Sequence, residues 1–181
     1  MIARVLDIPP KRVVRSTIHF LTNEEVDGLL AAPDRDTWLG RRDHTLLRVA
    51  IQTGLRVSEL TSLRCGDAQT DVGAHVRCLG KGRKERAIPL DKPTAAIVRV
   101  WQRERHGAPT DPLFPTRRGD VLSTDAVAWL LRKHTNTAAR SQPSLLDKNI
   151  TPHVLRHTCA MRLLVRGVAS DATAESIRRM V

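Results

Sequence analysis

The sequence of 181 residues contains no tyrosine and has only three tryptophans and two phenylalanines. Proteins that bind single-stranded nucleic acid by stacking need exposed aromatic faces, so the composition argues against that kind of platform. No apolar stretch approaches the roughly 18 residues of a membrane-spanning helix. Residues 1–10 also lack the pattern of a signal peptide. We therefore expect a cytoplasmic protein.

Cysteines are few, odd in number and scattered. Cys65, Cys78 and Cys159 have neither the even count of a disulfide framework nor the paired spacing of a zinc site. The composition therefore predicts no metal ion, and we expect no cofactor.

Positive charge is what the sequence has in excess. Thirty Lys and Arg residues against nineteen Asp and Glu residues give a formal net charge of +11 and an isoelectric point near 10.9. Lys and Arg neutralise phosphates and release their counterions, which supplies affinity for nucleic acid of any sequence. The charge favours a nucleic-acid partner, and a basic protein with no polyanionic partner is the alternative.

The length fits one domain with a short arm. Residues 1–20 are predicted to form a basic arm or linker, because Ile8-Pro9-Pro10 disfavours helix. A disordered terminus is the alternative. Residues 21–181 are predicted to form the domain. The arm residues that we expect near DNA are Lys11, Arg12 and Arg15.

Apolar residues recur at helical spacing through most of the domain. Thr22 and Glu25 form a capping box that begins the first helix. In the fourth helix, Ile97, Val100 and Trp101 are expected to face inward. The ranges predicted to be helical are 22–32, 41–52, 57–63, 92–106, 123 or 124 to 139, and 151–165.

The middle of the sequence changes to strand-like patterning. Two short runs, 74–79 and 85–90, flank a glycine-rich and basic turn, which indicates a β-hairpin. Pro89 restricts the second strand to an edge of the sheet or makes it end there. The predicted fold class is mainly α with a small antiparallel β-hairpin or sheet, that is, α+β.

The first candidate site lies in residues 53–60 (TGLRVSEL), where Arg56 follows a helix-ending glycine. A guanidinium can donate two parallel hydrogen bonds to a phosphate and stays charged at any working pH. Glu59, three residues later, shares the helix face and could orient Arg56. A solvent-exposed charge is the alternative for each residue.

The second candidate is residues 80–86 (GKGRKER), the predicted turn of the hairpin. Lys81 follows Gly80 and can project an ammonium toward a ligand, and Lys84 is the competing candidate. Arg83 and Lys84 are further candidates for DNA contacts. So are Arg117 and Arg118, in the loop predicted over 109–119.

The third candidate is residues 153–157 (HVLRH). His153, Arg156 and His157 share one helix face near a helix N-terminus, where unpaired N–H groups favour a phosphate. His157 is expected to be a packed, hydrogen-bonded structural residue. A metal pair of His153 and His157 is disfavoured, because a zinc-protease helix needs glutamate where Val154 stands.

These three segments, in this order, resemble the active-site boxes of the tyrosine recombinases, also called phage integrases. The resemblance covers about residues 20–168 and implies the fold of the recombinase catalytic domain. It also implies DNA integration and recombination by strand breakage and rejoining, without a cofactor, on double-stranded DNA bound by several recombinase protomers. In its terms Arg56 and Arg156 clamp the phosphate, Lys81 protonates the leaving 5′ oxygen, and His153 handles a proton beside them.

The resemblance ends near Val168. Members of that family continue with a third box and a nucleophilic tyrosine, whereas residues 169–181 contain no His, Trp or Tyr. Family members also carry an N-terminal DNA clamp. We therefore expect a catalytic domain incomplete at its C-terminus and inactive alone, from a bacterium, phage or mobile element. The alternative is a non-catalytic DNA-binding regulatory module that competes with or joins full-length recombinases, and an unrelated metal hydrolase or nuclease is a third candidate.

Overall fold

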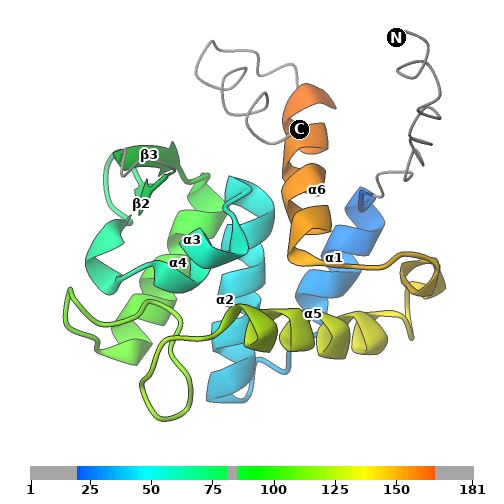
Figure 1. Ribbon diagram of the computed structural model, residues 1–181, viewed down its shortest axis with the longest axis horizontal. Helices are drawn as coiled ribbons and strands as arrows, with labels where there is room; N and C mark the ends of the chain where they lie inside the picture. Colours follow the sequence, from blue (N-terminus) through cyan, green and yellow to red (C-terminus); the bar gives the residue numbers. More distant parts are fainter. Residues whose placement is uncertain (1–19, 81–84, 166–181) are drawn as a thin grey trace, which may run out of the picture.

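A computed structural model of the protein describes residues 20–80 and 85–165 (Figure 1). The predicted arm, apart from Phe20, lies outside the described residues, and so do Lys11, Arg12 and Arg15. No helix in the described ranges is both long enough and apolar enough to cross a membrane.

The described elements follow the predicted order of helices, hairpin and helices. They are α1 (Asn23–Ala31), α2 (Trp38–Thr53), α3 (Val57–Ser62), a 3-10 helix (Cys65–Asp67), β1 (Ala68–Gln69), β2 (His75–Leu79), β3 (Glu85–Pro89), α4 (Lys92–Arg105), α5 (Thr124–Ala138), a 3-10 helix (Pro143–Asp147) and α6 (Pro152–Val165).

Helix α2 is the central element of the domain. It packs against α4 and against α6, while α1 packs against α2 and α5. In Figure 1 the small sheet lies on the side of the molecule opposite α1 and α6, and α5 crosses the lower side. The core therefore forms around α2, and the start of α3 follows directly from its C-terminal end.

The ends of α2 set where the candidate site begins. The helix starts at Trp38, three residues before the predicted Arg41, because the Thr37 hydroxyl accepts a hydrogen bond from the Gly40 N–H at 3.1 Å. Its other end is as predicted: Gly54 is left-handed, with φ of 61°, and donates to the Ala50 carbonyl at 3.0 Å.

The N-terminus of α1 carries the predicted capping box. The Thr22 hydroxyl accepts from the Glu25 N–H at 3.3 Å, and the Glu25 carboxylate accepts from the Thr22 N–H at 2.8 Å. That carboxylate is buried and also accepts from Lys148 Nζ at 2.6 Å and from the Ser144 hydroxyl at 2.8 Å. The cap of α1 therefore anchors the loop that leads into α6.

The sheet has one more strand than predicted. Its order is β1-β2-β3, antiparallel throughout, with Cys78 paired to Arg86. Pro89 is the last residue of an edge strand, as predicted. The two-residue strand β1 was missed, because Ala68–Gln69 is too short to show an alternating pattern.

One inward residue of α4 was predicted wrongly. Val100 is 62% exposed, whereas Trp101 is buried and donates from Nε1 to the Leu113 carbonyl at 2.8 Å. The buried face runs through Ala95, Val98 and Trp101, at helical spacing. Val100 therefore lies on the solvent side, and Ile97 is only partly buried.

A buried ionic network joins α2 to α5. The Asp43 carboxylate accepts from Arg42 Nη2 at 2.6 Å and lies 2.9 Å from His134 Nε2. Arg42 Nη1 also donates to the Pro115 carbonyl at 2.8 Å. Because a buried charge is tolerated only when it is paired, this network fixes α5 and the preceding loop to the central helix.

Candidate active site

Arg56 occupies the corner between α2 and α3. After the left-handed Gly54 the chain becomes extended, and Arg56 is the N-cap of α3 with φ of −64° and ψ of 151°. Its backbone N–H donates to Glu59 Oε2 at 2.8 Å, and its Nη1 donates to Glu59 Oε1 at 3.3 Å. Glu59 therefore contacts Arg56, as their three-residue spacing predicts. The Arg56 side chain is 47% exposed, and among the described residues Nη1 is the one guanidinium atom with a hydrogen bond.

Arg156 reaches the same corner from α6. Its side chain is buried, and Nη1 donates to the Gly54 carbonyl at 2.7 Å. Burial lowers the pKa of Arg156 from its ordinary value, and repulsion by Arg56 lowers it further, while Glu59 opposes both. Two guanidinium groups separated by a hundred residues of sequence are thus held in one electrostatic environment.

The two histidines of α6 pair with each other. His153 is exposed and His157 is buried, and their Nε2 atoms lie 2.6 Å apart with the rings edge to face. One ring must supply the hydrogen and the other the lone pair. Burial, then His153, then Arg156 lower the pKa of His157. The expectation that His157 is a packed, hydrogen-bonded residue is consistent with this geometry.

Arg86 belongs to the cluster and was missed in the sequence. It is the second residue of β3, and its Nη2 donates to Glu59 Oε2 at 2.9 Å. The alternation of side chains along the strand could have identified Arg86. It lies on the same face of β3 as Ile88, and both side chains are partly buried. The pairing itself depends on α3, which is distant in sequence.

The predicted lysine lies outside the described residues. Residues 81–84 contain Lys81, Arg83 and Lys84, so their placement at the site stays a prediction. Arg117 and Arg118 are exposed, as predicted for their loop. Within residues 20–80 and 85–165, no group of three or more His, Cys, Asp or Glu side chains is placed to hold a metal ion.

The described cluster combines one buried carboxylate with three guanidinium groups. Glu59 is hydrogen-bonded to Arg56 and Arg86 and also acts electrostatically on Arg156. These guanidinium groups lie partly out of water, where hydrogen bonds to an anion are stronger than at an open surface. The arrangement can therefore hold an anion with several acceptor oxygens, such as a phosphodiester.

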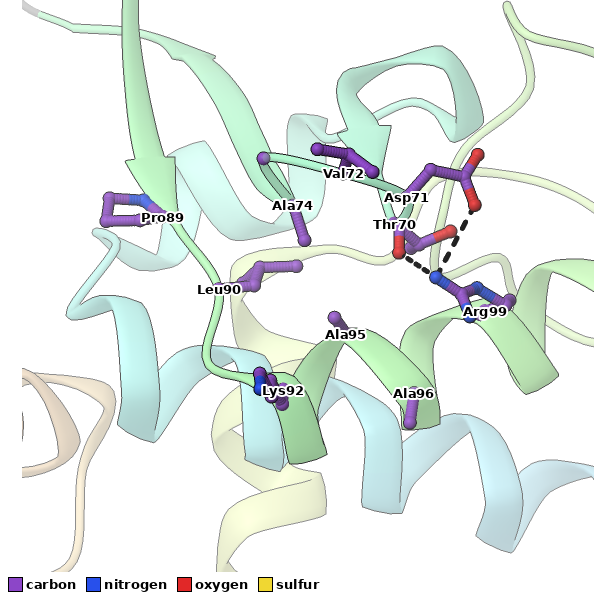
Figure 2. Close-up of a pocket in the computed structure, with 11 residues that line it drawn as sticks. Thr70, Asp71, Val72, Ala74, Pro89, Leu90, Lys92, Ala95, Ala96 and Arg99 are labelled. Carbon is purple, nitrogen blue, oxygen red and sulfur yellow. Dashed lines mark hydrogen bonds and ion pairs between the residues drawn. The ribbon is translucent and has the colours of Figure 1, made fainter.

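A cavity elsewhere in the domain has a lining different from the arginine cluster. This cavity, of about 570 Å³, lies between the turn after β1 and the first half of α4. Figure 2 shows the residues that line it. Arg99 closes one side by donating to the Thr70 carbonyl and pairing with Asp71 at 3.4 Å. None of the candidate active-site residues lines it. The arginine cluster is therefore a separate feature, exposed through Arg56.

His157 is expected to titrate below the ordinary histidine pKa of about 6.5. Because its imidazolium is disfavoured in the folded protein, the unfolded chain binds more protons. The free energy of unfolding should consequently fall as the pH drops below about 6.5. Histidine NMR titration, with His157→Gln for assignment, measures this pKa. A value at or above 6.5 would contradict the prediction, and so would an unchanged pH dependence of unfolding in His157→Gln.

Solved structures and sequence relatives agree with this architecture. The crystal structure of XerA recombinase superposes with a TM-score of 0.74 at 27% identity, over 94% of this chain and 57% of that chain. A XerH recombinase structure gives a TM-score of 0.72 at 23% identity, over 93% and 51% of the two chains. The predicted fold class, mostly helical with a small antiparallel sheet, is confirmed.

The sequence relatives are integrases and recombinases. The putative integrase/recombinase y4rC of Sinorhizobium fredii is 53% identical over 167 residues, which cover 92% of this chain and 50% of that protein. The tyrosine recombinase XerD of Pseudomonas aeruginosa is 37% identical over 152 residues, which cover 81% of this chain and 49% of that protein. The chain thus spans about half the length of these relatives. Residues 19–177 match the model of the phage integrase family, and the chain belongs to that family.

Proposed function

We propose that this chain binds double-stranded DNA through a backbone phosphate held between Arg56 and Arg156, as part of a protein of DNA integration and recombination. One observation carries the proposal. Arg156 of α6 donates to the carbonyl of Gly54, two residues before Arg56, so two guanidinium groups converge on the corner between α2 and α3. A phosphate carries negative charge and several acceptor oxygens, which suit two neighbouring guanidinium groups.

The two arginines have different parts in the proposed site. Arg156 is buried and braced by a backbone carbonyl, so its orientation is set before DNA arrives. Arg56 is half exposed, and among the described residues only its Nη1 donates a guanidinium hydrogen bond. During strand transfer negative charge builds on the non-bridging phosphate oxygens, and donors already in place stabilise it without reorganising. His153, exposed beside Arg156 on α6, would accept or donate a proton there.

Lys81 completes the proposed chemistry. Lys81 belongs to the segment that connects β2 to β3 in the sequence, and Arg86 of β3 contacts the cluster through Glu59. From that segment an ammonium could protonate a leaving 5′ oxygen, which is the role implied by the family resemblance. Arg83 and Lys84 would add contacts to the DNA backbone, as would the exposed Arg117 and Arg118.

Relatives support duplex DNA and recombinase protomers as partners. The XerH structure is a pre-cleavage complex with its difH substrate, and the integrase of the transposon Tn1549 is bound to circular intermediate DNA. A lambda integrase fragment is a dimer bound to a core site. By analogy with these proteins, we propose that this chain acts on DNA in the cytoplasm, together with other protomers, in the context of a mobile element.

The nucleophile is the part that these 181 residues do not supply. They contain no tyrosine, so they cannot by themselves form a phosphotyrosyl bond. The same observation favours a second candidate function, in which the chain occupies DNA or joins full-length recombinases without cutting. Both candidates need the arginine pair, and they differ in whether a tyrosine from another polypeptide completes the site.

The substitution Arg56→Gln should weaken binding to a short DNA duplex. We expect about a tenfold loss of affinity, and a decrease of about one in the slope of log K against log salt concentration, because one phosphate contact is removed. Fluorescence anisotropy at several salt concentrations measures both. Arg103→Gln, on the exposed last turn of α4, removes the same charge away from the cluster and serves as the control. Equal effects of the two substitutions would contradict the proposal.

Incubation with a nicked duplex tests the chemistry separately. We expect no protein–DNA adduct that survives denaturing electrophoresis, because the chain has no tyrosine to attack the phosphodiester. A full-length relative incubated in parallel shows that the DNA is competent. A stable adduct formed by this chain alone would contradict the proposed binding without cutting.

A further inference from the structure

Glu59 has two arginine partners, and the two contact its carboxylate in different ways. Its side chain is only 7% exposed, so the carboxylate depends on protein donors. Oε2 accepts from Arg86 Nη2 at 2.9 Å and from the Arg56 backbone N–H at 2.8 Å, whereas the Arg56 guanidinium reaches only Oε1, at 3.3 Å. The shorter cationic contact therefore comes from the strand and the longer one from the helix.

The exposed fractions of the two arginine side chains differ in the same sense as their contacts with Glu59. The Arg86 side chain is 28% exposed and that of Arg56 is 47% exposed. In the described part of the chain, Nη1 is the single atom of the Arg56 guanidinium with a hydrogen bond. Arg86 is thus the more enclosed partner of Glu59, and Arg56 keeps most of its donors outside the cluster.

A carboxylate beside an arginine is also a competitor for a phosphate. Carboxylates accept two parallel hydrogen bonds from a guanidinium in the same geometry that phosphates use. If both oxygens of Glu59 turned to Arg56, they would occupy the donors that a DNA phosphate needs. Oε2 would complete that fork, and Arg86 is the cationic side chain that occupies it, beside the backbone N–H of Arg56.

Arg86 also links the contact between Glu59 and Arg56 to the paired strands β2 and β3. It is the second residue of β3, opposite Cys78 of β2, and in the sequence it closely follows residues 81–84. A shift of β3 would move the Arg86 guanidinium relative to Glu59. The position of the hairpin and the freedom of Arg56 are therefore coupled through one buried carboxylate.

We propose that Arg86 is a positioning residue that holds Glu59 away from a forked contact with Arg56, so that Arg56 stays available to a DNA phosphate. This inference rests on the proposed function, because it takes the ligand of Arg56 to be a phosphate. It assigns Arg86 an effect through Glu59 and Arg56 and no contact with the DNA.

Substitutions in pairs test this assignment by DNA affinity. Arg86→Gln should weaken duplex binding about tenfold, because Glu59 then forks onto Arg56. Adding Glu59→Gln should restore the affinity to within about threefold of wild type, since a neutral amide binds a guanidinium more weakly than a carboxylate does and still caps α3. No restoration of affinity by the added Glu59→Gln, or no loss with Arg86→Gln, would overturn the inference.

Two matched variants separate positioning from net charge. Glu85→Gln added to Arg86→Gln restores the same net charge on the same strand but leaves Glu59 in place, so binding should stay weak. Arg77→Gln removes an arginine of β2 that contacts Glu85 and the Gly66 carbonyl and not Glu59. Rescue by Glu85→Gln equal to that by Glu59→Gln, or a loss with Arg77→Gln equal to that with Arg86→Gln, would also overturn it.

Arginine side-chain NMR tests the inference without DNA. In free protein, Arg86→Gln should shift the Nε–Hε signal of Arg56 and slow the rotation of its guanidinium, and Glu59→Gln should reverse both changes. Unchanged Arg56 signals would overturn the positioning role even where DNA binding is intact. Absence of DNA binding by the wild-type chain would instead overturn the proposed function, and the NMR result would still decide the role of Arg86.

Discussion

The hydrogen bond from Arg156 to the Gly54 carbonyl is the contact on which the candidate site depends. It brings a guanidinium from α6 to the turn where α2 ends and α3 begins, against the repulsion of Arg56. Burying one arginine near another is unfavourable unless anionic or dipolar groups compensate. The carbonyl and Glu59 provide part of that compensation. The packing of α6 on α2 keeps the two arginines together whether or not an anion is present.

The cluster brings three arginines to one buried carboxylate. Glu59 accepts hydrogen bonds from Arg56 and Arg86, and its side chain is buried. In the proposed site, an anion between Arg56 and Arg156 would relieve the repulsion between them, so preorganisation would supply part of its affinity. In this arrangement Arg86 competes with Arg56 for the Glu59 carboxylate, and it thereby sets how many Arg56 donors are bound to Glu59. Binding and strand cleavage are also separable, because the first needs the arginines and the second needs a nucleophile.

Features set by neighbouring residues could be predicted from the sequence. The Thr22–Glu25 capping box, the left-handed Gly54 and the start of α6 after Thr151 all depend on a few consecutive residues. The pairing of Arg56 with Glu59 follows from helical spacing in the same way. The inward orientation of Val100 was wrong, because the face that α4 buries is chosen by its neighbours. Arg86 was missed because its partner lies on α3, and proximity of Arg56 to Arg156 could be inferred only through the family resemblance.

The most direct test of the arginine pair is a crystal of the protein soaked with tungstate, a heavy analogue of phosphate that anomalous scattering locates without bias. Arg56 and Arg156 should both donate to one tungstate ion at the corner between α2 and α3, at hydrogen-bonding distances of about 2.7–3.2 Å. The ion should be lost in Arg56→Gln. An ion bound by only one of the two arginines, or an empty corner in crystals that bind tungstate elsewhere, would contradict a shared phosphate site.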